Sequence, residues 1–136
     1  RDGLPRMLSI LTAITEGKGK EGDIDTLEEL CEVLSYGALC GLGTSAANPV
    51  LSTIKYVREE YDAHILDRKC PAGVCKALIT YRIDPDACTG CTLCAKKCPQ
   101  ECISGERKQT HIIDETKCIR CGVCKDVCNF EAVKVE

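Results

Sequence analysis

The sequence predicts an α+β fold, with helices in the first half of the chain and short strands joined by cysteine-rich loops in the second. Three observations support this prediction. Apolar residues recur at helical spacing in three segments before residue 67. Eight of the thirteen cysteines fall into two runs of identical spacing between residues 88 and 128. The segment that contains these runs repeats itself with an offset of 30 residues.

Three helices are expected to form a small antiparallel bundle over residues 1–66. The glycine-rich segment 17–22 ends the first helix, a capping-box pattern at Asp25 and Glu28 starts the second, and Asn48-Pro49 starts a third that runs to about Leu66. The residues expected on the buried faces are Leu4, Met7, Leu8, Leu11 and Ile14 in the first helix, Leu27, Leu30, Cys31 and Leu34 in the second, and Val50, Ile54, Val57 and Tyr61 in the third. Cys31 is therefore predicted to be a packing residue.

The two cysteine runs have the spacing of iron–sulfur ligands. They are Cys88-x2-Cys91-x2-Cys94-x3-Cys98, followed by a proline, and Cys118-x2-Cys121-x2-Cys124-x3-Cys128. In bacterial ferredoxins, three cysteines of such a run ligate one 4Fe–4S cluster and the fourth ligates the other cluster. The predicted ligands are Cys88, Cys91, Cys94 and Cys128 for cluster 1, and Cys98, Cys118, Cys121 and Cys124 for cluster 2. Residues 83–136 are thus expected to form a two-cluster bacterial-type ferredoxin fold.

The internal repeat indicates how each half of this domain is built. An offset of 30 residues aligns Ile83-Asp84 with Ile113-Asp114 and each cysteine of the first run with its partner. Each half is expected to contain a short strand, a cluster loop, a helical turn and a return strand. The same offset aligns Cys102 with Ala132, so Cys102 is predicted to be a packing residue and not a ligand.

Composition argues against other uses of these cysteines. Thirteen cysteines cannot all pair as disulfides, and zinc ribbons use pairs of CxxC, not CxxCxxC triplets. Free thiols in this number indicate a reducing compartment, which we expect to be the cytoplasm. A net charge of −3 gives no indication of nucleic-acid binding, and no apolar run approaches the ~18 residues of a membrane span.

The charge of the predicted ferredoxin half is balanced. Residues 82–136 carry nine Lys or Arg and nine Asp or Glu, and Lys96, Lys97 and Lys125 adjoin the cluster loops. A neutral ferredoxin domain is consistent with docking against another protein, although an ordinary solvated face explains the same pattern.

A further group of metal-binding residue types lies in the expected linker, residues 67–82, and just before it. His64, Cys70 and Cys75 fall within twelve residues, at a helix end and a Pro-Gly turn. They have the character of a structural zinc site, whose fourth ligand is not evident. Spacing alone leaves open two buried thiols and a surface histidine. Cys40 lies in a glycine-rich turn, where the backbone can approach a ligand closely.

Four segments give the chain a family resemblance. They are LCGLG at 39–43, NPVLST at 48–53, EEYDAHI at 59–65 and CPAGVC at 70–75, ahead of the two cysteine runs. This pattern resembles the C-terminal region of the flavin-containing beta subunit of NAD(P)-dependent FeFe-hydrogenases, including the electron-bifurcating type. That subunit is related to the flavoprotein subunit of respiratory complex I, whose members lack the appended ferredoxin unit.

The resemblance implies a third cluster and a larger enzyme. The family holds a further 4Fe–4S cluster with a CxxCxxC run followed by Arg-x-Gly and one distant cysteine. Arg1-Asp2-Gly3 matches the end of that run and Cys40 matches the distant ligand, so the other three ligands are expected upstream of Arg1. The resemblance also implies zinc at His64, Cys70 and Cys75, and FMN and NAD(P) in an upstream domain.

The implied function is an electron relay without a catalytic residue of its own, within an oxidoreductase. Electrons would pass among flavin, soluble ferredoxin and hydrogenase subunits, a catalytic alpha subunit and a small thioredoxin-like gamma subunit being the expected partners. Two alternatives are a free-standing two-cluster ferredoxin carrier and a subunit-docking module of another soluble NADH-dependent reductase.

Overall fold

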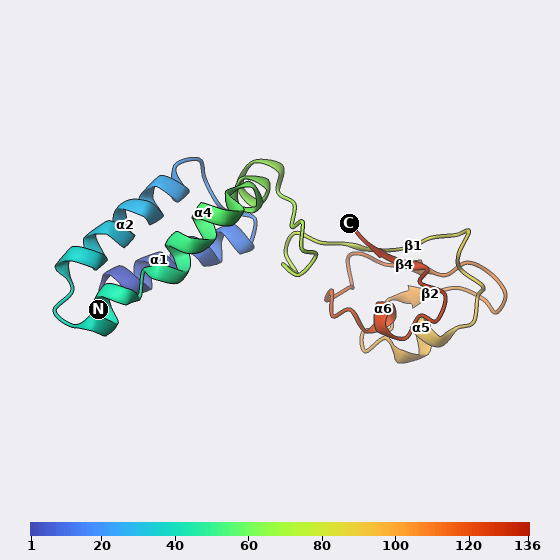
Figure 1. Cartoon of the computed structure of the whole chain (residues 1–136). Coiled ribbons are helices and arrows are strands. Elements are labelled where there is room, and N and C mark those ends of the chain that lie inside the picture. Colours follow the sequence, from blue (N-terminus) through green and yellow to red (C-terminus); the bar gives the residue numbers. More distant parts are fainter. The chain divides into compact units, whose positions relative to one another are not determined.

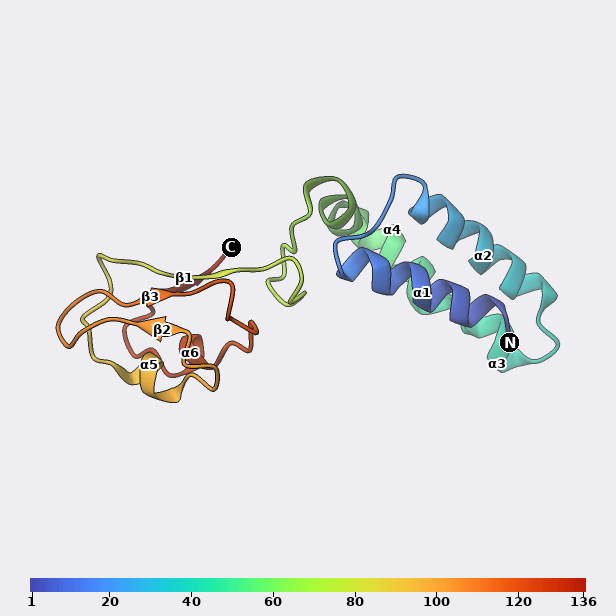
Figure 2. The same cartoon turned by 180° about the vertical axis from the view of Figure 1, so that it is seen from behind.

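The computed structural model describes residues 1–136 and confirms an α+β protein (Figures 1 and 2). The chain divides into two compact units, Arg1–Leu78 and Ile79–Glu136. Helices make up the first unit, while two small sheets and two short helices make up the second. None of the helices combines the length and the apolar character that crossing a membrane requires.

The first unit is built from α1 (Gly3–Thr15), α2 (Asp23–Gly37), the short α3 (Gly41–Ser45), α4 (Asn48–Asp62) and the π-helix η1 (Ala63–Asp67). Helix α2 packs against α1, α3 and α4, and α1 also contacts η1. The core residues come from every helix except α3, with Ala47 just before α4: Met7, Ile14, Ile24, Leu27, Cys31, Ala47, Ile54 and Ile65. Burial of this apolar surface is what holds the helices together.

Most of the predicted helix faces are correct, and Leu27 and Cys31 are completely buried. The prediction is wrong for Leu4 and Leu8, which are 46% and 66% exposed. The buried stripe of α1 is centred on Met7 and Ile14, and Leu8 lies about 100° around the helix from Met7.

The predicted start of the second helix is also wrong, whereas the third helix begins at Asn48 as expected. Helix α2 begins at Asp23, whose carboxylate accepts a hydrogen bond from the Lys20 amide at 2.8 Å, so Asp25 is not the cap. Helix α4 begins at Asn48, and the position before it is taken by Ala47, which is fully buried, with the Cys31 Sγ 3.9 Å from the Ala47 carbonyl. Backbone torsions at Val57 interrupt α4, and that side chain is 38% exposed.

The second unit contains β1 (Tyr81–Ile83), α5 (Leu93–Lys97), β2 (Ile103–Ser104), β3 (Ile112–Ile113), α6 (Val123–Asp126) and β4 (Val133–Val135). Each half therefore has the expected order of strand, loop, helical turn and strand. Strand β1 pairs antiparallel with β4, and β2 pairs antiparallel with β3. Every strand pair thus joins the first half of the unit to the second.

Hydrogen bonds extend the internal repeat beyond the strands. The Asp84 amide donates to the Ala132 carbonyl at 2.8 Å, and the Asp114 amide donates to the Cys102 carbonyl at 2.7 Å. In turn, the amides of Cys88 and Cys118 donate to the Asp84 and Asp114 carbonyls at 3.0 and 3.1 Å. The first cysteine of each run is therefore fixed to a residue that is itself fixed to the other half.

The burial of Leu27 leads to a prediction about the first unit. We expect Leu27→Ala to lower the free energy of unfolding of the helical unit by about 2–5 kcal/mol, because the site is fully enclosed and a cavity would remain. Urea unfolding followed by circular dichroism at the helix band measures this change. Leu42→Ala is the matched control, because Leu42 is 85% exposed and its loss should change stability by less than about 0.5 kcal/mol. Equal effects of the two substitutions would contradict the described core.

Candidate metal centres

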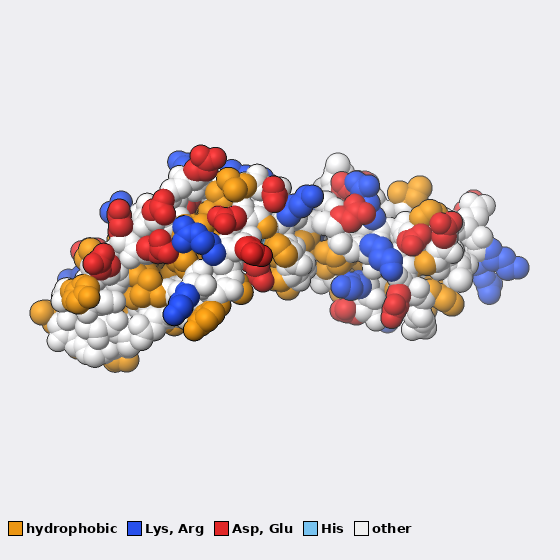
Figure 3. Space-filling model, turned by 45° about the horizontal axis from the view of Figure 1, so that its top comes forward, with side chains coloured by type: hydrophobic (Ala, Val, Ile, Leu, Met, Phe, Trp, Pro, Cys, Tyr) orange, Lys and Arg blue, Asp and Glu red, His pale blue; other side chains and the backbone are white.

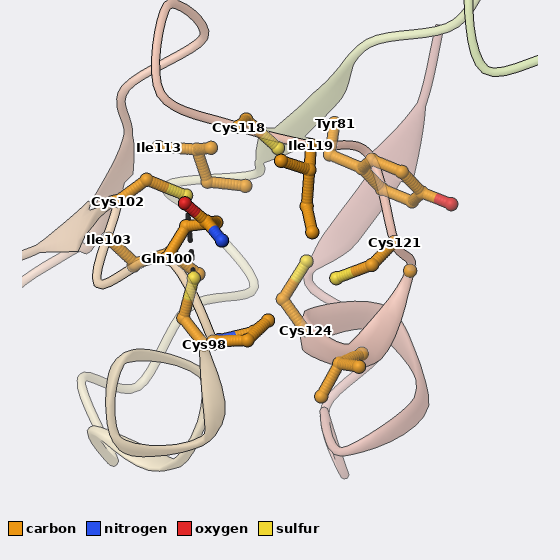
Figure 4. A pocket seen from close by; sticks show the side chains of 13 residues that line it. Tyr81, Cys98, Gln100, Cys102, Ile103, Ile113, Cys118, Ile119, Cys121 and Cys124 are labelled. Atoms are coloured by element: carbon orange, nitrogen blue, oxygen red, sulfur yellow. Dashed lines mark hydrogen bonds between the residues drawn. The ribbon is translucent and has the colours of Figure 1, made fainter.

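Two cavities in the second unit are lined by cysteines. The first cavity is lined by Cys88, Cys91, Cys94 and Cys128 together with His111, two threonines and apolar side chains. The second cavity is lined by Cys98, Cys118, Cys121 and Cys124, with Cys102 as a fifth cysteine (Figure 4). Each cavity therefore brings together three cysteines of one run and the last cysteine of the other, which are the two sets grouped from the sequence.

Left-handed backbone torsions bend the loops around these cavities. The residue two positions after the first cysteine has φ +67° at Gly90 and +55° at Arg120, and the residue after the second cysteine has φ +68° at Thr92 and +84° at Gly122. A β-branched residue such as Thr92 rarely adopts this conformation, so the loop shape is imposed at some cost. The bends turn three successive cysteines of each run toward one cavity.

Gly90 has a second role in the first loop. A Cβ atom at this position would lie 2.5 Å from the Gln109 amide nitrogen and 2.6 Å from its carbonyl oxygen. Only glycine allows this close approach between backbones. The loop of the first cavity is thereby pressed against the segment that leads to β3.

In the metal-free chain, burial keeps the thiol of the third cysteine of each run neutral. Cys94 and Cys124 are the most buried cysteines of their runs, at 8% and 7% exposure. Desolvation raises the pKa of both thiols, to about 11 for Cys124, with nearby cysteines adding to the effect. A bound cationic metal centre reverses this preference, because it stabilises the thiolate form.

Cys102 lines the second cavity but is not equivalent to the other four cysteines. Its Sγ lies 3.4 Å from the Sγ of Cys98 (Figure 4), and only 5% of the residue is exposed. Desolvation and the contact with Cys98 raise the pKa of Cys102 to about 12. Burial also acts to raise the pKa of Cys98, but hydrogen bonds from the Cys102 and Gln100 backbone hold it below its ordinary value. Cys98 is thus the member of the pair that ionises more readily.

A third group, in the first unit, consists of His64, Cys70 and Cys75. Their potential ligand atoms all lie within 4.8 Å of one another, and His64 Nε2 is 3.4 Å from Cys75 Sγ. Zn²⁺ with bonds of about 2.0–2.3 Å in tetrahedral geometry places its ligands about 3.5 Å apart. His64 is 8% exposed, so the alternative of a surface histidine is wrong.

The tautomer of His64 suits metal binding. Its Nδ1 lies 2.6 Å from the Glu60 carbonyl, which can only accept, so Nδ1 carries the proton and Nε2 keeps its lone pair. Metal-ligating histidines commonly donate their other N–H to a carbonyl in this way. His64 lies in η1, one helical turn beyond Glu60 of α4, and this spacing places its ring beside the Glu60 carbonyl.

The loop that carries Cys70 and Cys75 is anchored on the turn between α1 and α2. The Arg68 guanidinium donates to the Gly17 carbonyl, and Leu78 packs directly over Gly17. Burial, the largest influence on the Cys70 thiol, raises its pKa, but hydrogen bonds from the Cys75 and Val74 backbone and from the Cys75 and His64 side chains outweigh it and lower the pKa to about 7. Burial and the contact with Cys70 raise the pKa of Cys75.

Cys40 lies at a different end of the first unit. It immediately precedes α3, a short helix where the glycine-rich sequence predicts a turn, and its side chain is exposed. The neighbouring Tyr36, Leu39 and Leu42 are exposed at 85% or more. Gly3 packs against Leu34 of α2, so the N-terminal residues lie at the same end as Cys40 (Figure 2).

The lowered pKa of Cys70 leads to a test in the metal-free chain. We expect iodoacetamide to alkylate Cys70 with a rate that rises with pH through a midpoint near 7, because only the thiolate reacts. Cys102, whose pKa is about 12, should stay unmodified over the same range. Peptide mass spectrometry at several pH values measures both. Cys75→Ala should move the Cys70 midpoint to higher pH, and an unchanged midpoint would contradict the described hydrogen bonds.

Two family models match the chain, one for each unit. Residues 1–64 match the NADH-ubiquinone oxidoreductase-F iron–sulfur binding region, and residues 87–133 match a 4Fe–4S dicluster domain. The chain is 53% identical over 133 residues to the HndC subunit of the NADP-reducing hydrogenase of Solidesulfovibrio fructosivorans, covering 98% of this chain and 27% of that protein. Because this match covers 98% of the chain, it includes both units.

The F subunits of NADH-quinone oxidoreductases are also similar. The chain is 38% identical over 77 residues to the protein of Streptomyces coelicolor, covering 57% of this chain and 17% of that protein. It is 48% identical over 66 residues to the protein of Escherichia coli, covering 48% of this chain and 15% of that protein. The chain thus spans between 15% and 27% of the length of these relatives.

The family resemblance inferred from the sequence is confirmed by these matches. The chain is thus an iron–sulfur region that is similar, over residues 1–64, to the NADH-ubiquinone oxidoreductase-F iron–sulfur binding region and, over residues 87–133, to 4Fe–4S dicluster domains.

Proposed function

We propose that the chain is the electron-transfer region of an NAD(P)-dependent hydrogenase and relays electrons between flavin, ferredoxin and hydrogenase subunits. The observation that carries this proposal is the pair of cavities, each lined by four cysteines from two different runs. The similarity to the NADP-reducing hydrogenase protein over 98% of the chain supports the choice of enzyme. Subunits of such an enzyme, a catalytic alpha subunit and a small thioredoxin-like gamma subunit, are the proposed partners.

Two 4Fe–4S clusters are the proposed occupants of these cavities. In our proposal the first cavity holds cluster 1 through Cys88, Cys91, Cys94 and Cys128, and the second holds cluster 2 through Cys98, Cys118, Cys121 and Cys124. Clusters held by four thiolates gain and lose single electrons. The chain's own contribution is to fix the eight thiols, to bury Cys94 and Cys124, and to hold both sites in one small unit with shared strands. Residues 79–136 would then be a two-cluster ferredoxin domain.

Cys40 is proposed to be one ligand of a further 4Fe–4S cluster, whose remaining ligands are expected ahead of Arg1. An exposed thiol among exposed Tyr36, Leu39 and Leu42 is consistent with a surface that another part of a protein covers. The match of residues 1–64 to an iron–sulfur binding region also supports this role, because Cys40 and the deeply buried Cys31 are the only cysteines in that segment.

His64, Cys70 and Cys75 are proposed to bind zinc as a structural site at the end of the helical bundle. Three ligand atoms within 4.8 Å, a histidine with Nε2 available and a thiol with a pKa of about 7 support this assignment. Zinc there would hold the loop of residues 68–78 closed, since few apolar side chains of this loop are buried. FMN and NAD(P) would bind in an upstream domain, and we place the enzyme in the reducing cytoplasm.

The charge distribution is compatible with docking to other subunits. Acidic and basic side chains are interspersed on the second unit in the view of Figure 3, and residues 82–136 carry no net charge. A free-standing ferredoxin carrier is a weaker proposal, because the hydrogenase relative shares both units. A pure docking module is the second alternative, and it does not account for eight cysteines that line two cavities.

The relay proposal predicts the effect of single ligand substitutions. We expect Cys91→Ser and Cys121→Ser each to lower the iron content of anaerobically prepared protein from about eight to about four atoms per chain, because each removes a thiolate from a different cavity. In the assembled enzyme both variants should lose electron transfer from NAD(P)H to hydrogenase. Iron analysis and turnover assays measure these outcomes.

Cys102→Ala is the matched control, because the repeat places Ala132 at the equivalent position and Cys102 lines the same cavity as Cys121. It should keep the iron content and the turnover of the unmodified chain. Variants at Cys91 and Cys121 that assemble and turn over normally would instead indicate a docking module.

Zinc binding is tested separately. We expect Cys75→Ser to lower bound zinc from about one atom per chain to near zero while iron stays unchanged, because its thiol lies 3.4 Å from His64 Nε2 and outside both cysteine runs. Plasma mass spectrometry of both metals measures this. Zinc that persists in this variant would rule out the assigned site.

A further inference from the structure

The second cavity contains one cysteine more than a 4Fe–4S cluster uses. Five cysteines line it, whereas such a cluster takes four thiolates. The proposed cluster 2 uses Cys98, Cys118, Cys121 and Cys124, and this leaves Cys102 without a part in electron transfer. A buried cysteine commonly serves as a packing residue, so any further role of Cys102 has to follow from what surrounds its thiol.

Cys102 is in direct contact with Cys98. Their Sγ atoms lie 3.4 Å apart, and Figure 4 shows the two sulfur atoms facing each other. The Glu101 amide donates to the Cys98 carbonyl at 3.3 Å, and Glu101 has a left-handed φ of +48°. This tight turn brings the two thiols together. A sulfur–sulfur bond is about 2.0 Å long, so the two atoms need to approach by only roughly 1.4 Å to form one.

The two thiols differ in accessibility. Cys102 is 5% exposed, which shields its thiol from a reagent in solution. Cys98 is only partly buried, so a small oxidant reaches this thiol first. Once oxidised, Cys98 has a second thiol 3.4 Å away with which to react. An accessible cysteine beside a second, resolving cysteine is the arrangement found in redox-sensitive sites.

Cys118 is the other thiol close to Cys102. The Arg120 amide donates to Cys118 Sγ at 3.4 Å, and the Cys118 amide donates to the Asp114 carbonyl at 3.1 Å, so Cys118 is held by its own loop. It lies sixteen residues from Cys102 in the sequence and is not joined to it by a turn. The structure therefore favours Cys98 as the partner of Cys102.

The internal repeat provides an equivalent turn without the second thiol. In the other half, the Glu131 amide donates to the Cys128 carbonyl at 3.3 Å, and Glu131 has a φ of +49°. Ala132 takes the place of Cys102, is 2% exposed and lines the first cavity. The two turns thus share their hydrogen bond and their left-handed residue, but only the turn at the second cavity carries a pair of thiols.

We propose that Cys98 and Cys102 form a reversible disulfide when the second cavity holds no cluster and the chain meets a peroxide. Hydrogen peroxide transfers one oxygen atom to the Cys98 sulfur, which becomes a sulfenic acid as the O–O bond breaks and one water leaves. The Cys102 sulfur then attacks the Cys98 sulfur, the S–S bond forms, the S–O bond breaks, and the thiol proton leaves in a second water. Two thiols are oxidised and one peroxide is reduced to two waters.

The consequence of this disulfide rests on the proposed function, which makes Cys98 a ligand of cluster 2. The disulfide withholds the Cys98 thiolate, so cluster 2 assembles only after a dithiol has reduced the bond. It also stops the oxidation of Cys98 at a reversible stage, before sulfinic and sulfonic acids form. Cys128 at the first cavity lacks this protection, because Ala132 has no thiol.

Mass spectrometry of the full chain tests the disulfide. The chain is freed of metal with a chelator under reducing conditions, treated with a small excess of hydrogen peroxide, alkylated with iodoacetamide in denaturant and digested with trypsin. Cleavage after Lys97 and Arg107 gives a peptide whose only cysteines are Cys98 and Cys102. We expect most of this peptide to be unalkylated and lighter than its dithiol form by two hydrogen atoms. Alkylation of both cysteines, or a bond from Cys102 to the peptide of residues 118–120, would overturn the proposal.

Cys102→Ala gives the second cavity the residue that the first cavity has. After peroxide treatment and reduction with dithiothreitol, we expect this variant to carry at least about fivefold more sulfinic and sulfonic acid at Cys98 than the unmodified chain. Cys128, in the peptide of residues 126–134, is the internal control and should be oxidised equally in both chains. Equal oxidation of Cys98 in the two chains would contradict the protective role of Cys102.

Ala132→Cys is the converse substitution, because the turn before it matches that of Cys98 and Cys102. Peroxide should now link Cys128 to the introduced thiol, and alkylation of both would contradict the role given to the turn. Iron analysis of the untreated chain tests the proposed function separately. Far fewer than about eight irons would overturn the proposed clusters and leave the disulfide standing, whereas eight irons without the disulfide would overturn only this inference.

Discussion

Each half of the second unit provides strands and one cysteine to the other half, and the rest of that unit depends on this exchange. Neither half pairs its own strands, since β1 pairs with β4 and β2 with β3. Neither half completes its own cavity, since Cys98 and Cys128 each line the cavity of the opposite run. With two-stranded sheets and few large apolar residues, the apolar core is too small to fix the fold alone. Metal bound to the exchanged cysteines would supply the missing stability.

The two halves of the repeat share their backbone structure but differ in some of their side chains. Backbone torsions, hydrogen bonds to Asp84 and Asp114, and strand order are duplicated almost residue for residue. Many side chains are not duplicated, and among the differing pairs are Cys102 and Ala132, His111 and Tyr81, and Pro99 and Asn129. Two sites of the same geometry can therefore have different electrostatic surroundings. For an electron relay, such differences order the potentials of neighbouring clusters without any change of ligand.

The first unit is proposed to serve the same function by different means. Its apolar core is formed by packed helices and is centred on Leu27 and Cys31. Candidate metal ligands lie at both of its ends. One end bears the loop of Cys70 and Cys75, anchored by Arg68 on the turn between α1 and α2. The other bears Cys40 among exposed apolar side chains. Covering of such a surface by another protein segment is the usual reason for its presence.

The sequence by itself determined the grouping of the eight cysteines, the α+β class and the family, because ligand spacing and a 30-residue repeat are local patterns that survive any detail of packing. The start of α2 at Asp23, whose carboxylate accepts a hydrogen bond from the Lys20 amide, could not be predicted from the capping-box pattern at Asp25 and Glu28 alone. The same holds for His64, whose burial depends on a π-helix and a distant loop.

His111 was not singled out at all, although the repeat offered a signal in its alignment with Tyr81. Only the tertiary structure decided that its ring is buried and that Nε2 lacks a partner, because both properties arise from contacts with Gly105 and Gln109 that no local pattern encodes.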